Sequence, residues 1–99
     1  YEDYPFHDEN WTVMRHRKNK KIFACVFQRQ GCIWINVKCG PGWREFWRQK
    51  YEAVIPAYHM NKEHWNSILL NGTVDESDIR DMIGESYRLT APKGKNISR

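Results

Sequence analysis

The stretch IFACVFQRQGCIWINV, residues 22–37, decides the fold. On both sides of Arg29-Gln30-Gly31 its side chains alternate with a period of two residues, as expected for two strands joined by a turn. The alternation places Ile22, Ala24 and Val26 on one face of the first strand and Phe23, Cys25 and Phe27 on the other. Because both faces carry apolar groups, we expect a sheet covered by helices on one face and partly covered on the other.

The same period extends upstream to Thr12, with a break at Lys18-Asn19-Lys20, so a second hairpin precedes the first. Downstream, Cys39-Gly40-Pro41-Gly42 ends the strand pattern. Proline, glycine and asparagine then divide the rest of this region into segments. We expect a short helix over 43–51, an extended segment over 53–60, a turn at Asn61-Lys62 and a strand over 64–70.

A helix is predicted after Asp75, a good N-cap residue. Its apolar stripe has helical spacing and comprises Ile79, Met82, Ile83, Ser86 and Tyr87. This helix is expected to end before Pro92, leaving a basic tail over 93–99. The order of elements contains no βαβ repeat, so we predict an α+β fold over 1–92, an antiparallel sheet with helices packed on one face.

Size and composition limit the kinds of protein to be considered. Ninety-nine residues with 40% hydrophobic residues and five tryptophans predict one globular domain around a single core. No apolar run approaches the roughly 20 residues of a membrane span, so no membrane partner is expected. The start of the chain is acidic, and the three cysteines match neither a disulfide framework nor a C-x-x-C zinc pair. We therefore expect a cytoplasmic protein with reduced thiols.

The positive charge is concentrated in one short segment. Five cations fall within seven residues with no acid among them: Arg15, Arg17, Lys18, Lys20 and Lys21. The whole chain carries +4, so the rest of it sums to −1. A projecting basic turn can place several cations along a phosphate backbone, where His16 and Asn19 could add hydrogen bonds. The alternative is a solvated turn whose lysines protect a sheet edge.

Metal binding and catalysis are weakly supported. His59 and His64 are five residues apart, whereas a helical ligand pair needs four and a strand pair needs two. The chain contains no G-x-S-x-G elbow and no glycine-rich phosphate loop. Its cysteines lie in or beside apolar strands, where a thiol usually acts as a small core residue. We expect no metal and no cofactor, and an uncharacterised enzyme is kept only as the third and least favoured hypothesis.

Several short motifs follow one another in order along nearly the whole chain. The most specific is N-K-x-H-W at Asn61 to Trp65, followed by a strand, Asn71-Gly72 and an acidic helix. The others are Pro5-Phe6, Lys21-Ile22-Phe23-Ala24, Val37-Lys38-Cys39, Val54-Ile55-Pro56, His59-Met60 and Ser86-Tyr87. In these motifs the chain resembles the MmcQ/YjbR family of small bacterial proteins, and it is identified as a member of that family.

The resemblance implies a fold similar to CyaY, the frataxin-like α/β sandwich. Family members usually begin with a helix that leads into the Pro5-Phe6 segment, so this helix is expected to be missing or replaced here. A DNA-binding role through a double-wing arrangement has been proposed for the fold, and it agrees with the basic hairpin. Iron binding of the frataxin type is not carried over, because a fold does not fix a function.

The first hypothesis is therefore a domain that binds double-stranded DNA through phosphate contacts. The five hairpin cations would form one wing, with Lys62, Arg44 and Arg48 as secondary contacts. The second hypothesis is a protein-binding or small-ligand-binding module. Its pocket would be lined by Tyr58 together with the family motif His59, Asn61, His64 and Trp65, which also contains Lys62.

Overall fold

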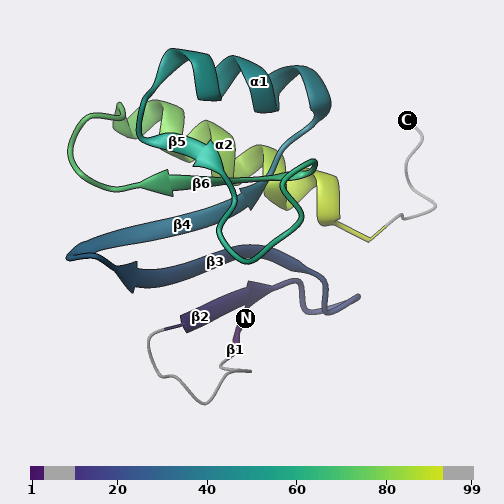
Figure 1. Ribbon diagram of the computed structural model, residues 1–99. Coiled ribbons are helices and arrows are strands. Elements are labelled where there is room, and N and C mark those ends of the chain that lie inside the picture. Colours follow the sequence, from purple (N-terminus) through teal and green to yellow (C-terminus); the bar gives the residue numbers. More distant parts are fainter. Residues whose placement is uncertain (4–10, 93–99) are drawn as a thin grey trace.

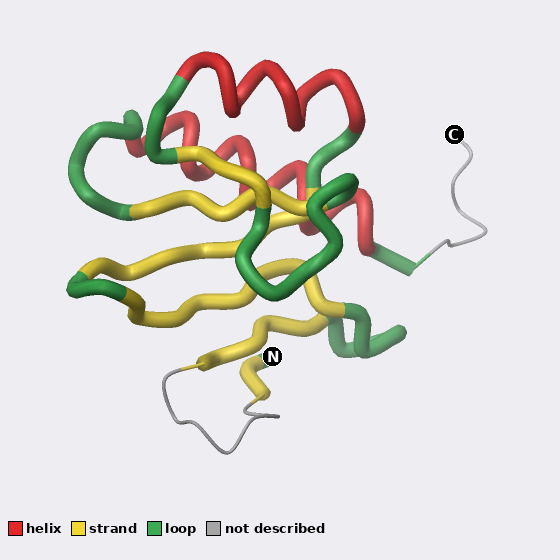
Figure 2. Tube along the Cα trace, in the orientation of Figure 1, coloured by secondary structure: helices red, strands yellow, loops and turns green. Residues whose placement is uncertain are grey.

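The computed structural model describes residues 1–3 and 11–92. Figures 1 and 2 show one antiparallel sheet of six strands, in the order β1-β2-β3-β4-β6-β5, with two helices packed against it. The strands are β1 (Glu2–Asp3), β2 (Trp11–Arg15), β3 (Ile22–Arg29), β4 (Cys32–Lys38), β5 (Val54–Pro56) and β6 (Trp65–Leu69). The helices are α1 (Pro41–Lys50) and α2 (Glu76–Thr90). The predicted α+β class is confirmed.

The two predicted hairpins are present. β3 and β4 pair from Ala24 opposite Val37 to Arg29 opposite Cys32, joined at Gln30 and Gly31. Both turn residues have positive φ, 55° and 75°, which matches the twist of a tight hairpin turn. At the other hairpin, Lys20 has a φ of 61° in the turn between β2 and β3. The sequence pattern therefore located both breaks correctly.

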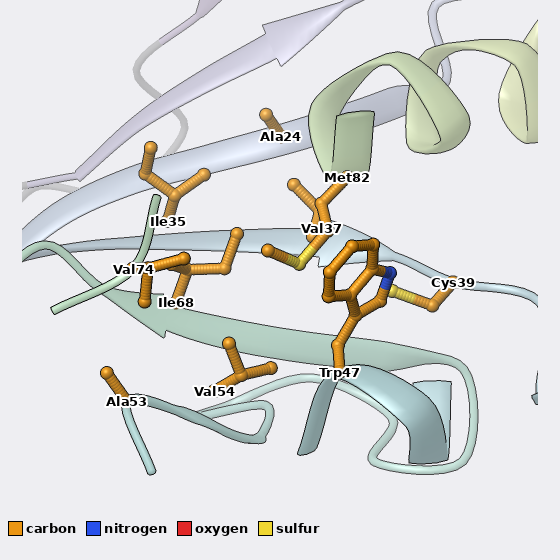
Figure 3. Close-up of a cluster of buried hydrophobic side chains, with 10 residues drawn as sticks. All are labelled: Ala24, Ile35, Val37, Cys39, Trp47, Ala53, Val54, Ile68, Val74 and Met82. Atoms are coloured by element: carbon orange, nitrogen blue, oxygen red, sulfur yellow. The ribbon is translucent and has the colours of Figure 1, made fainter. Parts of the chain in front are cut away.

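The main core lies between the sheet and the two helices (Figure 3). Val37, Ile68 and Val54 come from three neighbouring strands and are almost fully buried. Met82 of α2 and Trp47 of α1 pack against them from the helical side. Because both helices reach the same cluster, the expected packing of helices on one face is confirmed.

One residue of β3 faces the opposite way from the prediction. Met14 pairs with Ala24, but the next residue, Arg15, pairs with Ile22, so Phe23 is an extra residue on β3. Such a bulge breaks the two-residue alternation and redirects a side chain. Phe23 therefore packs on the helical side, with its ring 4.8 Å from that of Tyr87 in α2. The assignment of Phe23 to the face of Cys25 was wrong for this reason.

The loop from Ala57 to His64 covers part of the other face and crosses in front of the strands in Figure 1. Tyr58 stacks on Phe27, with 5.8 Å between ring centroids, and meets Trp34 edge-on at 5.9 Å. Arg29 places its guanidinium 4.2 Å from the centre of the Tyr58 ring. This packing agrees with the partial cover that the sequence predicted.

Buried hydrogen bonds fix this loop to the sheet. Asn36 donates to the carbonyl oxygen of Tyr58 at 2.9 Å, and the Tyr58 amide donates to the hydroxyl of Ser67 at 2.9 Å. Ser67 in turn donates to the side-chain oxygen of Asn36. Neither Asn36 nor Ser67 is exposed, so the network satisfies polar groups that burial would otherwise leave without partners.

The start of α1 differs slightly from the prediction, whereas the start of α2 agrees with it. α1 begins at Pro41 rather than Trp43, because proline fits the first turn of a helix. Asp75 is the N-cap residue of α2, but its side chain makes no capping hydrogen bond. Asp78 in the first turn instead accepts hydrogen bonds from Tyr51 at 2.5 Å and from Lys50 at 3.0 Å. These contacts join the end of α1 to the start of α2.

The termini bear on two further expectations. β1 pairs with β2 through Glu2 and Asp3, so the first three residues contribute a short edge strand to the sheet. The Pro5-Phe6 segment and the basic tail over 93–99 lie outside the described residues. No helix of the described chain has the length and hydropathy needed to cross a membrane.

Candidate nucleic-acid interface

The turn between β2 and β3, residues 16–21, is held in one shape by its own backbone. The amide of His16 donates to Lys21 O at 2.9 Å, and the amide of Lys20 donates to His16 O at 3.0 Å. Arg15 donates from its guanidinium to Lys20 O at 2.8 Å. Asn19 accepts from the amide of Lys21 at 3.0 Å, as asparagine often does in tight turns.

Two turn residues bond to the end of α2 instead of facing outward. His16 is 5% exposed, and its Nε2 lies 2.9 Å from the hydroxyl of Thr90. That hydroxyl also lies 2.8 Å from Ser86 O, to which it can donate while accepting from Nε2 of His16. Asn19 donates to Thr90 O at 3.0 Å. These internal contacts weaken the idea that His16 and Asn19 donate to phosphate, which stays a prediction.

The remaining cations of the turn point to solvent. Arg17, Lys18, Lys20 and Lys21 are all exposed. Within the described chain, none of these four side chains makes a hydrogen bond or an ion pair. Arg15 differs, because it is half-buried and braces the turn. The structure thus presents four solvated cations on a turn that is anchored to α2.

The N-K-x-H-W motif forms a second turn, and α1 holds it by its backbone. Arg48 donates to Lys62 O at 2.6 Å, and Arg44 donates to Glu63 O. The Nε of Arg48 also bonds the side-chain oxygen of buried Asn66 at 2.6 Å. With these donors engaged inside the protein, Arg44 and Arg48 are less suited to phosphate than the hairpin cations. Their contact with nucleic acid stays a prediction.

The two turns lie at the same end of the sheet. Arg15 pairs with Ile22 at the close of β2, and Lys38 pairs with Trp65 where β6 begins. Figure 1 shows the β2–β3 turn and the start of β6 at this shared end. With neighbouring strands about 4.8 Å apart, the turns are separated by roughly 12 Å. Lys62 is exposed here, next to Glu63, which is also exposed.

The other motif residues have mixed surroundings. Asn61 accepts from the amide of Glu63 at 2.8 Å, and its carbonyl accepts from the amide of Trp65 at 3.0 Å. Trp65 is half-buried in β6. His59 is exposed, has a φ of 62° and packs against Tyr58 with ring centroids 4.1 Å apart. His64 is exposed as well, with its carbonyl accepting from the amide of Cys39.

These contacts give much of the motif a structural role. Asn61 and the carbonyl groups of the turn serve the backbone, which weakens the case that the motif lines a pocket. The pocket hypothesis itself stays a prediction.

The buried thiols are poor nucleophiles. Burial raises the pKa of Cys39 to about 12, with Glu85 adding to the rise and Arg48 and Arg44 opposing it. Burial also raises the pKa of Cys25 to about 11, against the opposing charge of Arg15. Both thiols are therefore protonated at neutral pH, when a thiolate would be needed for attack. Among the described residues, no three His, Cys, Asp or Glu side chains gather into a metal-binding group.

A groove beside the basic turn was not foreseen from the sequence. It lies between the turn and the end of α2, has a volume of about 310 Å³, and includes Arg17, Lys18, Phe23 and Tyr87 in its lining. Phe23 reaches it only because of the bulge in β3, which a two-residue period cannot reveal. The apolar stripe of α2 did contain Tyr87, but nothing in the stripe indicated that its ring would be 49% exposed.

Comparison with known proteins agrees with the family motifs. The model of the YjbR family matches residues 1–89. The chain belongs to the YjbR family. The uncharacterized protein YyaQ of Bacillus subtilis is 36% identical over 89% of this chain and 83% of its own length. The uncharacterized protein YjbR of Escherichia coli K12 is 28% identical over 80% of this chain and 67% of its own length.

Two solved structures of bacterial proteins are similar to this YjbR-family chain. A crystal structure of a protein from Pseudomonas syringae superimposes with a TM-score of 0.82 at 32% identity, covering 91% of this chain and 86% of that one. A crystal structure of a protein from Deinococcus radiodurans gives a TM-score of 0.81 at 25% identity, covering all of this chain and 72% of that one.

Proposed function

We propose that this YjbR-family protein binds double-stranded DNA through the sheet end that carries the basic turn. The observation behind the proposal is the arrangement of Arg17, Lys18, Lys20 and Lys21 as exposed cations on a turn fixed to α2 through His16 and Asn19. A cation with no partner in the described chain can contact phosphate without first breaking an internal ion pair. Because the turn is already ordered, binding loses less conformational entropy.

The second turn supports a double-wing arrangement. Lys62 lies in the turn before β6, at the same end of the sheet as the basic turn, so a duplex laid across that end would meet both turns. Glu63 beside it offsets much of the charge of Lys62. The first turn would therefore supply most of the phosphate attraction, and the second would mainly set the orientation on the duplex.

The proposal includes a CyaY-like fold and a cytoplasmic location. An antiparallel sheet with two helices on one face supports the first, and three cysteines that are all free thiols support the second. Neither Arg44 nor Arg48 is needed as a DNA contact.

The test uses fluorescence anisotropy with a labelled 20-base-pair duplex at 50 and 200 mM salt. The variant R17A/K18A removes two hairpin cations and lowers the net charge from +4 to +2. We expect an affinity at least tenfold lower at 50 mM salt. We also expect the slope of log K against log salt to be shallower by about 1.8, since each phosphate contact contributes about 0.9.

The matched control is Q49E/R80A, which gives the same net charge with both changes near the other end of the sheet. Gln49 is in the last turn of α1 and Arg80 is in the second turn of α2. We expect its affinity to stay within about twofold of the unaltered protein at 200 mM salt, where long-range charge effects are screened. The proposal fails if the unaltered protein does not bind duplex at 50 mM salt, or if both variants lose the same affinity.

A further inference from the structure

The groove between the basic turn and the end of α2 combines an aromatic surface with positive charge. Its lining combines the rings of Tyr1, His16, Phe23 and Tyr87 with the cationic side chains of Arg15, Arg17 and Lys18, and also includes Pro92. The residues come from three places in the chain, and the sheet bulge and the C-terminal turn of α2 bring them together. The groove is therefore a product of the tertiary fold and not of one local motif.

The aromatic side of the groove is rigid. The ring of His16 lies 4.2 Å from that of Tyr87 and 5.2 Å from that of Phe23, and Phe23 meets Tyr87 edge-on. The hydrogen bond from His16 to Thr90 fixes the histidine ring in the middle of this group. Tyr87 is the outermost ring and is 49% exposed. Nearly half of the Tyr87 surface is therefore accessible to a flat ligand group.

The charged side limits which flat groups fit. Arg17 and Lys18 are exposed and have no ion-pair partner in the described part of the chain. They disfavour a cationic ligand and favour one that carries negative charge close to its flat ring. A nucleotide has this combination, a base with a π-face joined to a phosphate, and basic grooves with exposed aromatic rings are a common way to hold unpaired bases.

We propose that this groove takes the base of an unpaired nucleotide, stacked on Tyr87, with the adjoining phosphates held by Arg17 and Lys18. The inference rests on the proposed function, because the same turn would hold the duplex from which the unpaired nucleotide extends. The protein should then bind a duplex with a single-stranded overhang more tightly than a blunt duplex.

The experiment compares a blunt 20-base-pair duplex with the same duplex carrying a three-nucleotide overhang, by anisotropy at 100 mM salt. The unaltered protein should bind the overhang duplex at least fivefold more tightly, the smallest gain expected from one base stacked on an aromatic ring. Y87L keeps apolar volume but removes the ring, and should lose this preference while its affinity for blunt duplex is unchanged. Y87F keeps the ring and should keep the preference.

Leu89 provides the control, since it is exposed on the same helix turn at 47% and does not line the groove. L89A should keep the full preference for the overhang. Blunt duplex bound as tightly as overhang duplex by the unaltered protein overturns this inference and leaves the proposed function standing. So does a preference that persists in Y87L, whereas absence of binding to either duplex removes the proposed function itself.

Discussion

Ser86 joins three elements through one hydroxyl group. It donates to Phe23 O in the bulge of β3 at 2.6 Å and accepts from the amide of Lys38 at the end of β4 at 2.8 Å. A bulge leaves a backbone group without a partner in the sheet, and Ser86 supplies that partner from α2. A polar residue therefore occupies this position in the apolar stripe of α2 because its hydroxyl bonds the Phe23 carbonyl at the β3 bulge.

We expect S86A to lower the free energy of unfolding by about 2–6 kcal/mol, because it leaves a part-buried carbonyl and a part-buried amide without their partner, at about 1–3 kcal/mol each. The measurement is urea unfolding followed by circular dichroism. S77A, at an exposed position in the first turn of α2, should change stability by no more than about 0.5 kcal/mol. A loss for S86A as small as that of S77A would show that the two backbone groups are satisfied without the hydroxyl.

His16 shows why a site residue can be misassigned from sequence. It stands between two arginines in a cationic run, and composition alone therefore places it on the charged surface. In the structure its position at the end of β2 turns its ring under the α2 C-terminus, where Thr90 and Tyr87 contact it. The sequence showed the charged residues on either side of His16, but it could not show that the ring of His16 contacts the end of α2.

The two helices are joined by a small cluster at the start of α2. Asp78 accepts from the hydroxyl of Tyr51 and from the ammonium group of Lys50, and these two hydrogen bonds, the first being the larger effect, lower the pKa of its carboxyl group. Its place in the first turn of α2 also suits a negative charge. When Asp78 is protonated, Tyr51 and Lys50 no longer donate to a negatively charged carboxylate, and the stabilisation from that charge is lost.

This cluster predicts how stability depends on pH. A carboxyl group whose pKa is lower in the folded protein adds stability above its unfolded pKa of about 3.9, and that stability is lost as the pH falls through the lowered folded value. D78N should therefore melt at a lower temperature than the unaltered protein at pH 7, and the two melting temperatures should converge as the pH falls through the lowered pKa of Asp78. D81N, a change at an exposed carboxylate one turn later, should show a smaller difference at pH 7. A D78N deficit that does not shrink at all as the pH is lowered below about 3.9 would contradict the proposed origin.

At the scale of elements, the sequence predicted those features that repeat along the chain. Period-two alternation and the apolar stripe of α2 located β2, β3 and β4, both hairpin turns and the long helix, because each pattern is built from many residues. The bulge at Phe23 and the loop over the second sheet face depend on single contacts between distant segments, and no periodic signal reports such contacts. For the same reason the four exposed cations could be predicted from their density, whereas the aromatic groove beside them could not.

Exposed positive charges that would attract DNA and a negative charge that would repel it lie at the same end of the sheet. Four exposed cations lie on the turn over 16–21, while the second turn carries Lys62 and Glu63 side by side. For a duplex spanning both turns, Glu63 would be the charge that opposes binding. At about 10 Å in water, one unit charge pair is worth about 0.4 kcal/mol, or roughly a factor of two in affinity.

E63Q should therefore bind duplex DNA about twofold more tightly than the unaltered protein at 50 mM salt, with a smaller gain at 200 mM, where screening shortens the range of the charge. E76Q removes the same charge at the first residue of α2, near the opposite end of the sheet. Since the exposed pair of Glu76 with Arg80 contributes little to stability, E76Q is a fair control, and it should leave duplex affinity unchanged at 200 mM salt. Equal gains for the two variants at both salt concentrations would mean that only net charge matters, and the second turn would then have no place at the interface.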